Sequence, residues 1–176
     1  MTLEEGKTKV GILLDELDNE TIDPDAEAKM PMLFDMAQKI IADIQPIVRT
    51  AEIVPTLGTW AQPMPEDFER AIRVWQNGKT VDRQWMGRSI ITTDAVTVEY
   101  AAAPATIDNE MDDTYVFEVS EIACQAMPFF VAANCIIVDP VTNPNPLLNQ
   151  WQMRLEEIRN RSGSAGGGQR RVKAVW

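Results

Sequence analysis

The chain has 176 residues, 45% of them hydrophobic and 24% charged, which is typical of a folded protein with one core and at most a small inserted unit. It contains no histidine, which excludes Ser-His-Asp and Cys-His catalysis and histidine-ligated zinc. The net charge is −11, but it is unevenly distributed: residues 1–157 hold 27 acids and 11 bases, and the rest holds five bases and no acid. An acidic body of this kind repels nucleic acid.

The cysteines and the apolar runs indicate where the protein is made. Cys124 and Cys135 lie in one stretch with helical character, about 16 Å apart at 1.5 Å per residue, which is too far for a disulfide. A chain without a cysteine framework is typical of a reducing compartment. The first residues lack the apolar segment of a signal peptide, and the longest apolar run, 127–138, is too short to span a bilayer. We therefore expect neither a secreted nor a membrane protein.

Two helices are predicted at the start of the chain from apolar residues at helical spacing. The first covers 3–17, and its apolar stripe is Leu3, Val10, Leu13, Leu14 and Leu17. The second runs from residue 25 or 26 to Ile44, and its inner face is Met30, Leu33, Phe34, Ala37, Ile41 and Ile44. Pro31 falls near the first turn of the second helix, and Pro46 ends it.

From residue 48 the pattern changes to β-structure. Asn77-Gly78 between the alternating segments 71–75 and 80–85 predicts a hairpin, because both turn residues tolerate a positive φ. Residues 89–92 and 95–101 predict a further pair of strands across Thr93-Asp94. The middle of the chain is thus predicted to be a small antiparallel β unit.

Two more helices are predicted after this unit. Residues 119–138 are apolar on almost every side, which is typical of a helix in the middle of a protein, and Pro128 is expected to kink or divide it. The residues predicted to form this buried core helix are Ile122, Met127, Phe130, Val131 and Ile137. The last helix is predicted over 147–160.

These elements predict an α+β fold, with a bundle of about four helices, an inserted small antiparallel β domain and a flexible C-terminal arm. The bundle is assigned to 1–47 and 118–162, the β insertion to 48–117 and the arm to 163–176.

No catalytic, metal or cofactor site is predicted. The acidic stretches 15–25 and 108–113 lack the glycine and glutamate positions of an EF-hand calcium loop, so we interpret them as solvated linkers. Cys124 has no histidine to activate it and is interpreted, like Cys135, as a small buried hydrophobe. A glycosidase-type carboxylate pair is not marked by any motif, and the glycines at 166–168 lack the rest of a phosphate-binding loop.

The C-terminal arm is the strongest candidate site. Its glycines provide reach, and its last eight residues combine charge with apolar side chains that can anchor it to a partner. The residues predicted to bind are Arg170, Arg171, Val172, Lys173, Val175 and Trp176. Terminal disorder and nucleic-acid binding are the alternatives; the acidic body disfavours the second, and we favour docking onto a partner protein.

Three segments resemble the head-to-tail adaptor (connector) proteins in the neck of tailed bacteriophages. They are the opening pair KTKVGILLDE (7–16) and KMPMLFDMAQK (29–39); VEYAAAPATI (98–107); and YVFEV (115–119) with AMPFFVAA (126–133) and the closing helix.

The resemblance implies a structural virion protein and not an enzyme, made in the host bacterial cytoplasm and located at the head–tail interface. Its copies are expected to form a ring, twelvefold to match the portal protein, that extends the channel for genome ejection and provides a platform for the next neck or tail protein. DNA is expected to pass without specific binding, because an acidic wall repels it. The alternatives are another neck or tail component, such as a stopper or tail-tube protein, and a small soluble enzyme or regulator.

Overall fold

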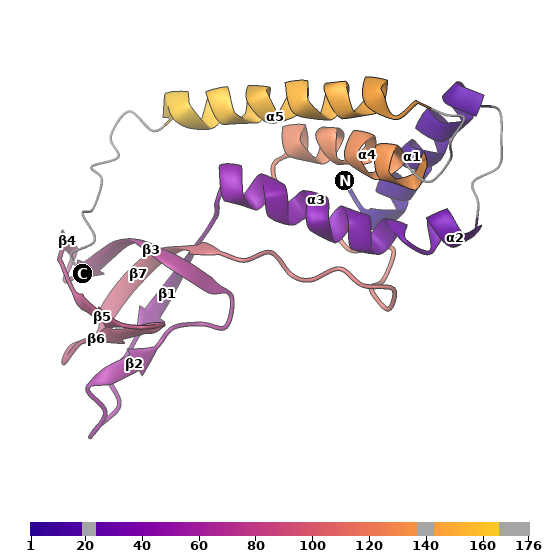
Figure 1. Ribbon diagram of the computed structural model, residues 1–176. Helices are drawn as coiled ribbons and strands as arrows, with labels where there is room; N and C mark the ends of the chain where they lie inside the picture. The colour runs from indigo at the N-terminus through magenta and orange to yellow at the C-terminus, as the bar shows by residue number, and fades with distance from the viewer. Residues whose placement is uncertain (19–23, 137–142, 166–176) are drawn as a thin grey trace. The chain divides into compact units, whose positions relative to one another are not determined.

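The computed structural model describes residues 1–18, 24–136 and 143–165. These residues form an α+β fold, as predicted, with four long helices and two small antiparallel sheets (Figure 1). The chain divides into two compact units: a helical unit of Met1–Gln45 with Thr106–Trp176, and a β unit of Pro46–Ala105. The helical unit is therefore built from two stretches of sequence that flank the β unit.

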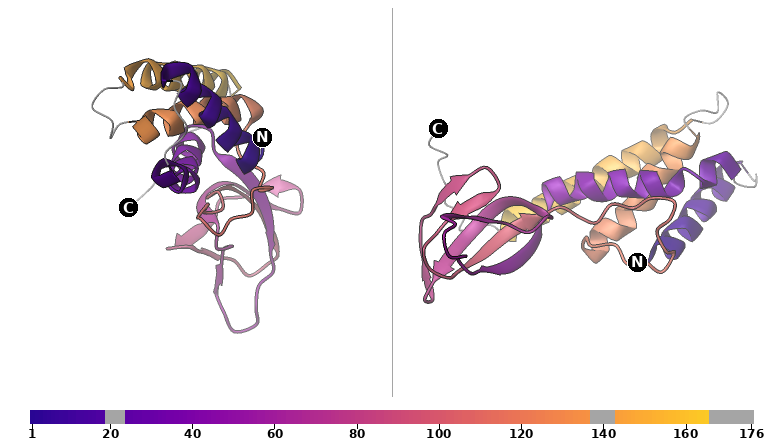
Figure 2. Two further views of the ribbon diagram at one scale, coloured as in Figure 1. Left: turned by 90° about the vertical axis from the view of Figure 1, so that its right-hand side faces the viewer. Right: turned by 90° about the horizontal axis from the view of Figure 1, so that it is seen from below.

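Helix α4 is the centre of the helical unit, and α1, α3 and α5 each pack against it (Figures 1 and 2). The helices of this unit are α1 (Leu3–Asp18), the one-turn α2 (Pro24–Glu27), α3 (Met30–Ile44), α4 (Glu121–Ile136) and α5 (Asn145–Ala165). α4 continues through Pro128 without being divided. Within the described ranges, none of the helices has the length and apolar character needed to cross a bilayer.

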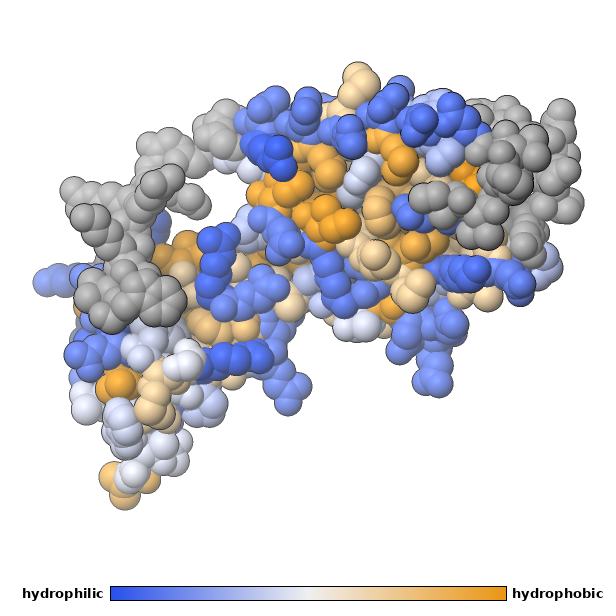
Figure 3. Space-filling view, in the orientation of Figure 1, coloured by the Kyte–Doolittle hydropathy of each residue, from blue (hydrophilic) through white to orange (hydrophobic). Residues whose placement is uncertain are grey.

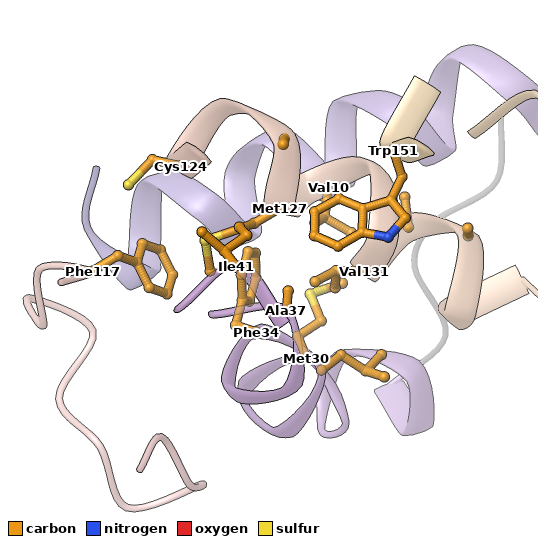
Figure 4. Packing of buried hydrophobic residues seen from close by; sticks show 14 of the residues in the cluster. Val10, Met30, Phe34, Ala37, Ile41, Phe117, Cys124, Met127, Val131 and Trp151 are labelled. Carbon is orange, nitrogen blue, oxygen red and sulfur yellow. The ribbon is translucent and has the colours of Figure 1, made fainter. Parts of the chain in front are cut away.

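The core of the helical unit forms where α1, α3 and α5 meet α4. Figure 4 shows Met127 and Val131 of α4 among side chains of α3 and α1, including Phe34 and Val10. All four of these side chains are fully buried. Burying one large apolar side chain stabilises a fold by about 1.5–3 kcal/mol, so this cluster holds the unit together.

The single helix predicted from residue 25 or 26 to Ile44 is in fact two helices. α2 ends at Glu27, a turn follows, and α3 begins at Met30 with Pro31 in its first turn. Pro31 has no N–H to donate to the carbonyl of Glu27, so a continuous helix would leave that acceptor without its helical partner. A proline is tolerated in a first turn, and the helix restarts there.

The first turn of α1 is closed by a capping box. The Thr2 hydroxyl accepts a hydrogen bond from the Glu5 N–H at 3.2 Å, and the Glu5 carboxylate accepts one from the Thr2 N–H at 3.0 Å. These bonds satisfy two donors that a helix start otherwise leaves unpaired. The box fixes the position at which α1 begins.

Residues 106–118 return from the β unit and pack within the helical unit, although the sequence assigned residues up to 117 to the β insertion. Two buried polar side chains of α3 hold them. The Asp35 carboxylate accepts a hydrogen bond from the Ile107 N–H at 3.0 Å, and the Gln38 side-chain oxygen accepts one from the Glu118 N–H at 2.9 Å. Buried polar groups are stable when paired in this way.

The β unit contains two antiparallel sheets. The four-stranded sheet has the order β1-β7-β3-β4, and the three-stranded sheet has the order β2-β6-β5. The strands are β1 (Ile47–Ile53), β2 (Ala61–Pro63), β3 (Phe68–Gln76), β4 (Lys79–Thr80), β5 (Gln84–Met86), β6 (Ser89–Ile91) and β7 (Val96–Ala102). Their apolar core comprises Ile53, Met64, Phe68, Val74, Ile90, Val96, Val98, Tyr100 and Ala102.

The predicted hairpin at Asn77-Gly78 is confirmed. Both residues have positive φ, 50° and 75°, as a type I′ turn requires, and β3 pairs with β4 across it. The strand after the turn, however, has only two residues, and residues 84–86 belong to the other sheet as β5.

The predicted pairing of 89–92 with 95–101 is wrong. Both segments are strands, but β6 pairs with β2 and β5, whereas β7 pairs with β1 and β3. The Thr92 side chain explains the difference, because its hydroxyl donates to the carbonyl of Asp94 at 2.7 Å and accepts from the Asp94 N–H at 3.3 Å. This local turn carries the chain from one sheet to the other.

Candidate interaction surfaces

The two units differ strongly in charge. The β unit has seven acidic and six basic residues, a net charge of −1. The helical unit has 20 acidic and 10 basic residues, a net charge of −10, and five of its bases lie at residue 159 or later. The acidity of the body is therefore a property of the helical unit.

The two thiols are protonated packing groups. Cys124 is buried, and burial raises the pKa of its thiol. Cys135 is half-buried, and burial raises the pKa of its thiol to about 11. A protonated thiol is a poor nucleophile and a poor metal ligand, which agrees with the interpretation of both cysteines as small hydrophobes. Among the described residues, no group of three or more Asp, Glu or Cys is placed to hold a metal ion.

The acidic stretch 108–113 is exposed, but its carboxylates have structural roles. The Asp108 carboxylate accepts a hydrogen bond from the Glu110 N–H, and the Asp112 carboxylate accepts from the side chain and N–H of Thr114, which lowers the pKa of Asp112. Asp113 forms an ion pair of 2.6 Å with Lys7 of α1. This stretch is thus an ordered turn that contacts α1 and not a plain solvated linker. The first acidic stretch has residues 19–23 outside the described part of the chain.

The predicted arm residues Arg170, Arg171, Val172, Lys173, Val175 and Trp176 lie outside the described residues. The structure describes the helix before them, α5, which starts two residues earlier and ends five residues later than predicted, at Ala165; residues 163–165, assigned to the arm, are therefore helical. Near its end, Arg161 contacts Glu157 at 2.7 Å, and Arg154 approaches the same carboxylate at 3.7 Å. Arg159 is exposed.

The residues predicted to form the buried core helix are found at two depths. Met127 and Val131 are fully buried, whereas Ile122 and Phe130 are half-buried and pack against the edge of the same cluster. Phe130 contacts Trp151 of α5, with ring centroids 5.2 Å apart. Ile137 lies outside the described residues.

A surface that the sequence did not indicate lies in the loop between β1 and β2, residues 54–60, which we call the apolar loop. Leu57 is fully exposed, and Val54 and Trp60 are 65% and 63% exposed. Figure 3 shows apolar side chains at the tip of the β unit. Single exposed apolar residues are ordinary, but three within seven residues make this loop a candidate for contact with another protein.

The apolar loop has a defined conformation because a buried glutamine holds it. Gln62 is 3% exposed; its side-chain oxygen accepts a hydrogen bond from the Thr56 N–H at 3.1 Å, and its amide donates to the carbonyl of Thr59 at 2.5 Å. The Thr59 N–H donates to the carbonyl of Thr56, and Gly58, at φ 84°, completes the turn. In the sequence, Pro55 and Gly58 indicate a turn, but no pattern identifies Gln62 as its support.

The base of the β unit is braced by a separate polar cluster. The Asp67 carboxylate accepts from the Arg49 guanidinium at 2.5 Å and from the Tyr100 hydroxyl at 3.1 Å. Burial and the bond to Asp67 raise the pKa of Tyr100, so its hydroxyl stays protonated as the donor. The cluster links β1 and β7 to the residue before β3.

No protein-family model matches this chain, and no curated protein matches it. Among the residues that the structure describes, the surfaces available for a functional assignment are the acidic helical unit and the uncharged apolar loop; the predicted C-terminal arm lies outside them.

Proposed function

We propose that this chain is a subunit of the head-to-tail adaptor ring of a tailed bacteriophage, located in the neck of the virion beneath the portal. Copies of the chain form a ring, expected to be twelvefold, that extends the DNA channel and provides a platform for the next neck or tail protein. The observation that carries the proposal is the division of charge, −10 on the helical unit against −1 on the β unit.

This division suits a DNA conduit that must not hold its cargo. Each Lys or Arg that binds a phosphate adds affinity and slows DNA passage, whereas an acidic wall repels the duplex. A ring whose helical units face the channel has a negative lumen, and its nearly neutral β units are free to make protein contacts. A structure of the assembled ring with a channel lined by Lys and Arg would contradict this assignment.

The fold is consistent with the sequence resemblance. Each segment that carries the resemblance supplies buried residues to one core: Val10 and Phe34 from the opening pair, Ile107 from the second segment, and Phe117 and Met127 from the third. The first and third segments lie in the helical unit, whereas residues 98–105 of the second segment belong to the β unit, where Val98, Tyr100 and Ala102 are part of the core.

We further propose that residues 166–176 attach the subunit to the portal or to a neighbouring copy. Arg170, Arg171 and Lys173 would steer this arm to an acidic surface, and Val172, Val175 and Trp176 would anchor it there. Strand β1, at one edge of the four-stranded sheet, is a candidate acceptor, because an extended peptide can add to a sheet edge.

The test is co-expression with the portal protein of the same phage, followed by affinity purification and electron microscopy. The proposal expects single rings seated on portals. Long tubes would favour the tail-tube alternative, and a monomer that never co-purifies with the portal would reject the proposal.

The arm is tested in the same assay by ending the chain at residue 165, which leaves α5 complete. We expect an unchanged melting temperature and loss of ring formation on the portal. A shortened chain that assembles normally would show that the arm is not the attachment device.

A further inference from the structure

We infer that neighbouring copies of this chain contact each other through the apolar loop of one copy and the exposed apolar line of α3 in the next. This inference rests on the proposed function for its setting, a closed ring of identical subunits. It identifies the surfaces that would close the ring.

The apolar loop has the properties of an inserting element. Its three exposed apolar side chains stand on a turn that Gln62 holds in place, so little conformational entropy is lost when the loop docks. The chain from residue 53 to residue 65 contains no charged residue. Desolvating such a loop against an apolar surface buries no unpaired charge.

The receiving surface is a line of apolar side chains along α3. Met32 and Met36 are 52% and 46% exposed, and Ile40, one further helical turn along, is half-buried. The three residues are four apart and span about 12 Å of one helix face. Methionine side chains adapt to the shape of an incoming group, which suits a surface that accepts an aromatic and a leucine.

Charge favours this pairing of surfaces over the contact of two helical units. Two helical units at −10 each repel one another, whereas the β unit, at −1, approaches a helical unit with far less repulsion.

The two surfaces are different and lie on different units of the chain. A contact between unlike surfaces is heterologous: each copy uses its loop on one neighbour and offers its α3 to the other, and such contacts close into rings when the rotation permits. A contact between two identical surfaces would instead stop at a dimer. The inferred interface therefore has the symmetry that an adaptor ring requires.

The first test is site-specific cross-linking in a chain in which Cys124 and Cys135 are replaced by alanine. Protein carrying Leu57→Cys is mixed at high concentration with protein carrying Met36→Cys, and a short bismaleimide is added. The matched control replaces Met36→Cys by Met153→Cys, which is 63% exposed on α5. We expect the 57–36 product to form at least several-fold faster than the 57–153 product; equal rates, or no 57–36 product, would overturn the inference.

The second test is a double-mutant cycle on self-association, measured by sedimentation. Leu57→Ser and Met36→Ser should each weaken association by about tenfold, the effect of losing one central apolar contact. The double variant should be little weaker than either single variant, and Met153→Ser should have no effect. Additive losses would place the two residues in separate interfaces and overturn the inference.

These outcomes separate the inference from the proposed function. Rings on portals without a 57–36 cross-link would leave the adaptor function standing and reject this interface. A 57–36 cross-link in a protein that never assembles on a portal would support the interface and reject the adaptor function.

Discussion

Replacing Gln62 by leucine removes both hydrogen bonds that hold the apolar loop while keeping a side chain of similar size in the buried position. A hydrogen bond of this kind contributes about 1 kcal/mol. The loss of both bonds should therefore lower the free energy of local opening of the loop by about 2 kcal/mol. Thr56 and Thr59 are exposed and can bond to water once the amide is gone. The free energy of unfolding of the β unit should therefore fall by only about 1 kcal/mol, which is less than the change in the free energy of local opening of the loop.

The assay is amide hydrogen exchange, because the Thr56 N–H is the donor to Gln62. A loss of about 2 kcal/mol in local protection corresponds to exchange about thirtyfold faster at this amide. Gln84→Leu is the matched control, since Gln84 is an exposed glutamine of the same unit. Unchanged exchange at Thr56 in Gln62→Leu would refute the view that this side chain organises the loop.

Four further predictions concern the helical unit and the arm. Met127→Ala, at a fully buried position, should lower the free energy of unfolding by about 3 kcal/mol in urea, whereas Met153→Ala on the exposed side of α5 should change it by less than about 0.5 kcal/mol. The Cys135 thiol, with its pKa raised by burial to about 11, should react slowly with iodoacetamide at pH 8, as followed by mass spectrometry. Because this thiol ionises at an ordinary value of 9.0 in the unfolded chain, its contribution to stability should be complete below pH 9 and be lost as the pH rises to about 11. Changing Arg170, Arg171 and Lys173 together to serine should weaken assembly on the portal most at low salt, and an equal loss at all salt concentrations would argue against electrostatic steering.

Local patterns in the sequence predicted most elements of the helical unit, although α2 and α3 were predicted as one helix. Apolar residues at helical spacing identified α1, α4 and α5, and an all-round apolar composition identified α4 as the central helix. In the β unit, Asn77-Gly78 marked its hairpin because a two-residue turn with positive φ needs those residue types. These features are set by residues close together in the chain.

Features that depend on distant residues could not be predicted in this way. Alternation shows that β6 and β7 are strands but does not show that Thr92 turns the chain into a different sheet between them. The apolar loop was missed for a similar reason, because exposure of Leu57 and burial of Gln62 depend on how the two sheets pack. The β insertion was predicted to end at residue 117, but the β unit ends at Ala105. The residues after it are held by Asp35 and Gln38, which lie far from them in the sequence, so no local pattern marks this boundary.

The split of the helical unit into two stretches has a consequence for how the chain folds during synthesis. α1 and α3 leave the ribosome first, yet the helix on which both pack, α4, follows only after the entire β unit. The β unit is continuous in sequence and can complete its core while Val10 and Phe34 still lack their partner. During that interval the nascent chain displays two apolar helix faces next to a finished domain, a situation that favours aggregation or chaperone capture. The arrival of α4 ends this vulnerable period, because it supplies the side chains against which both helix faces are buried.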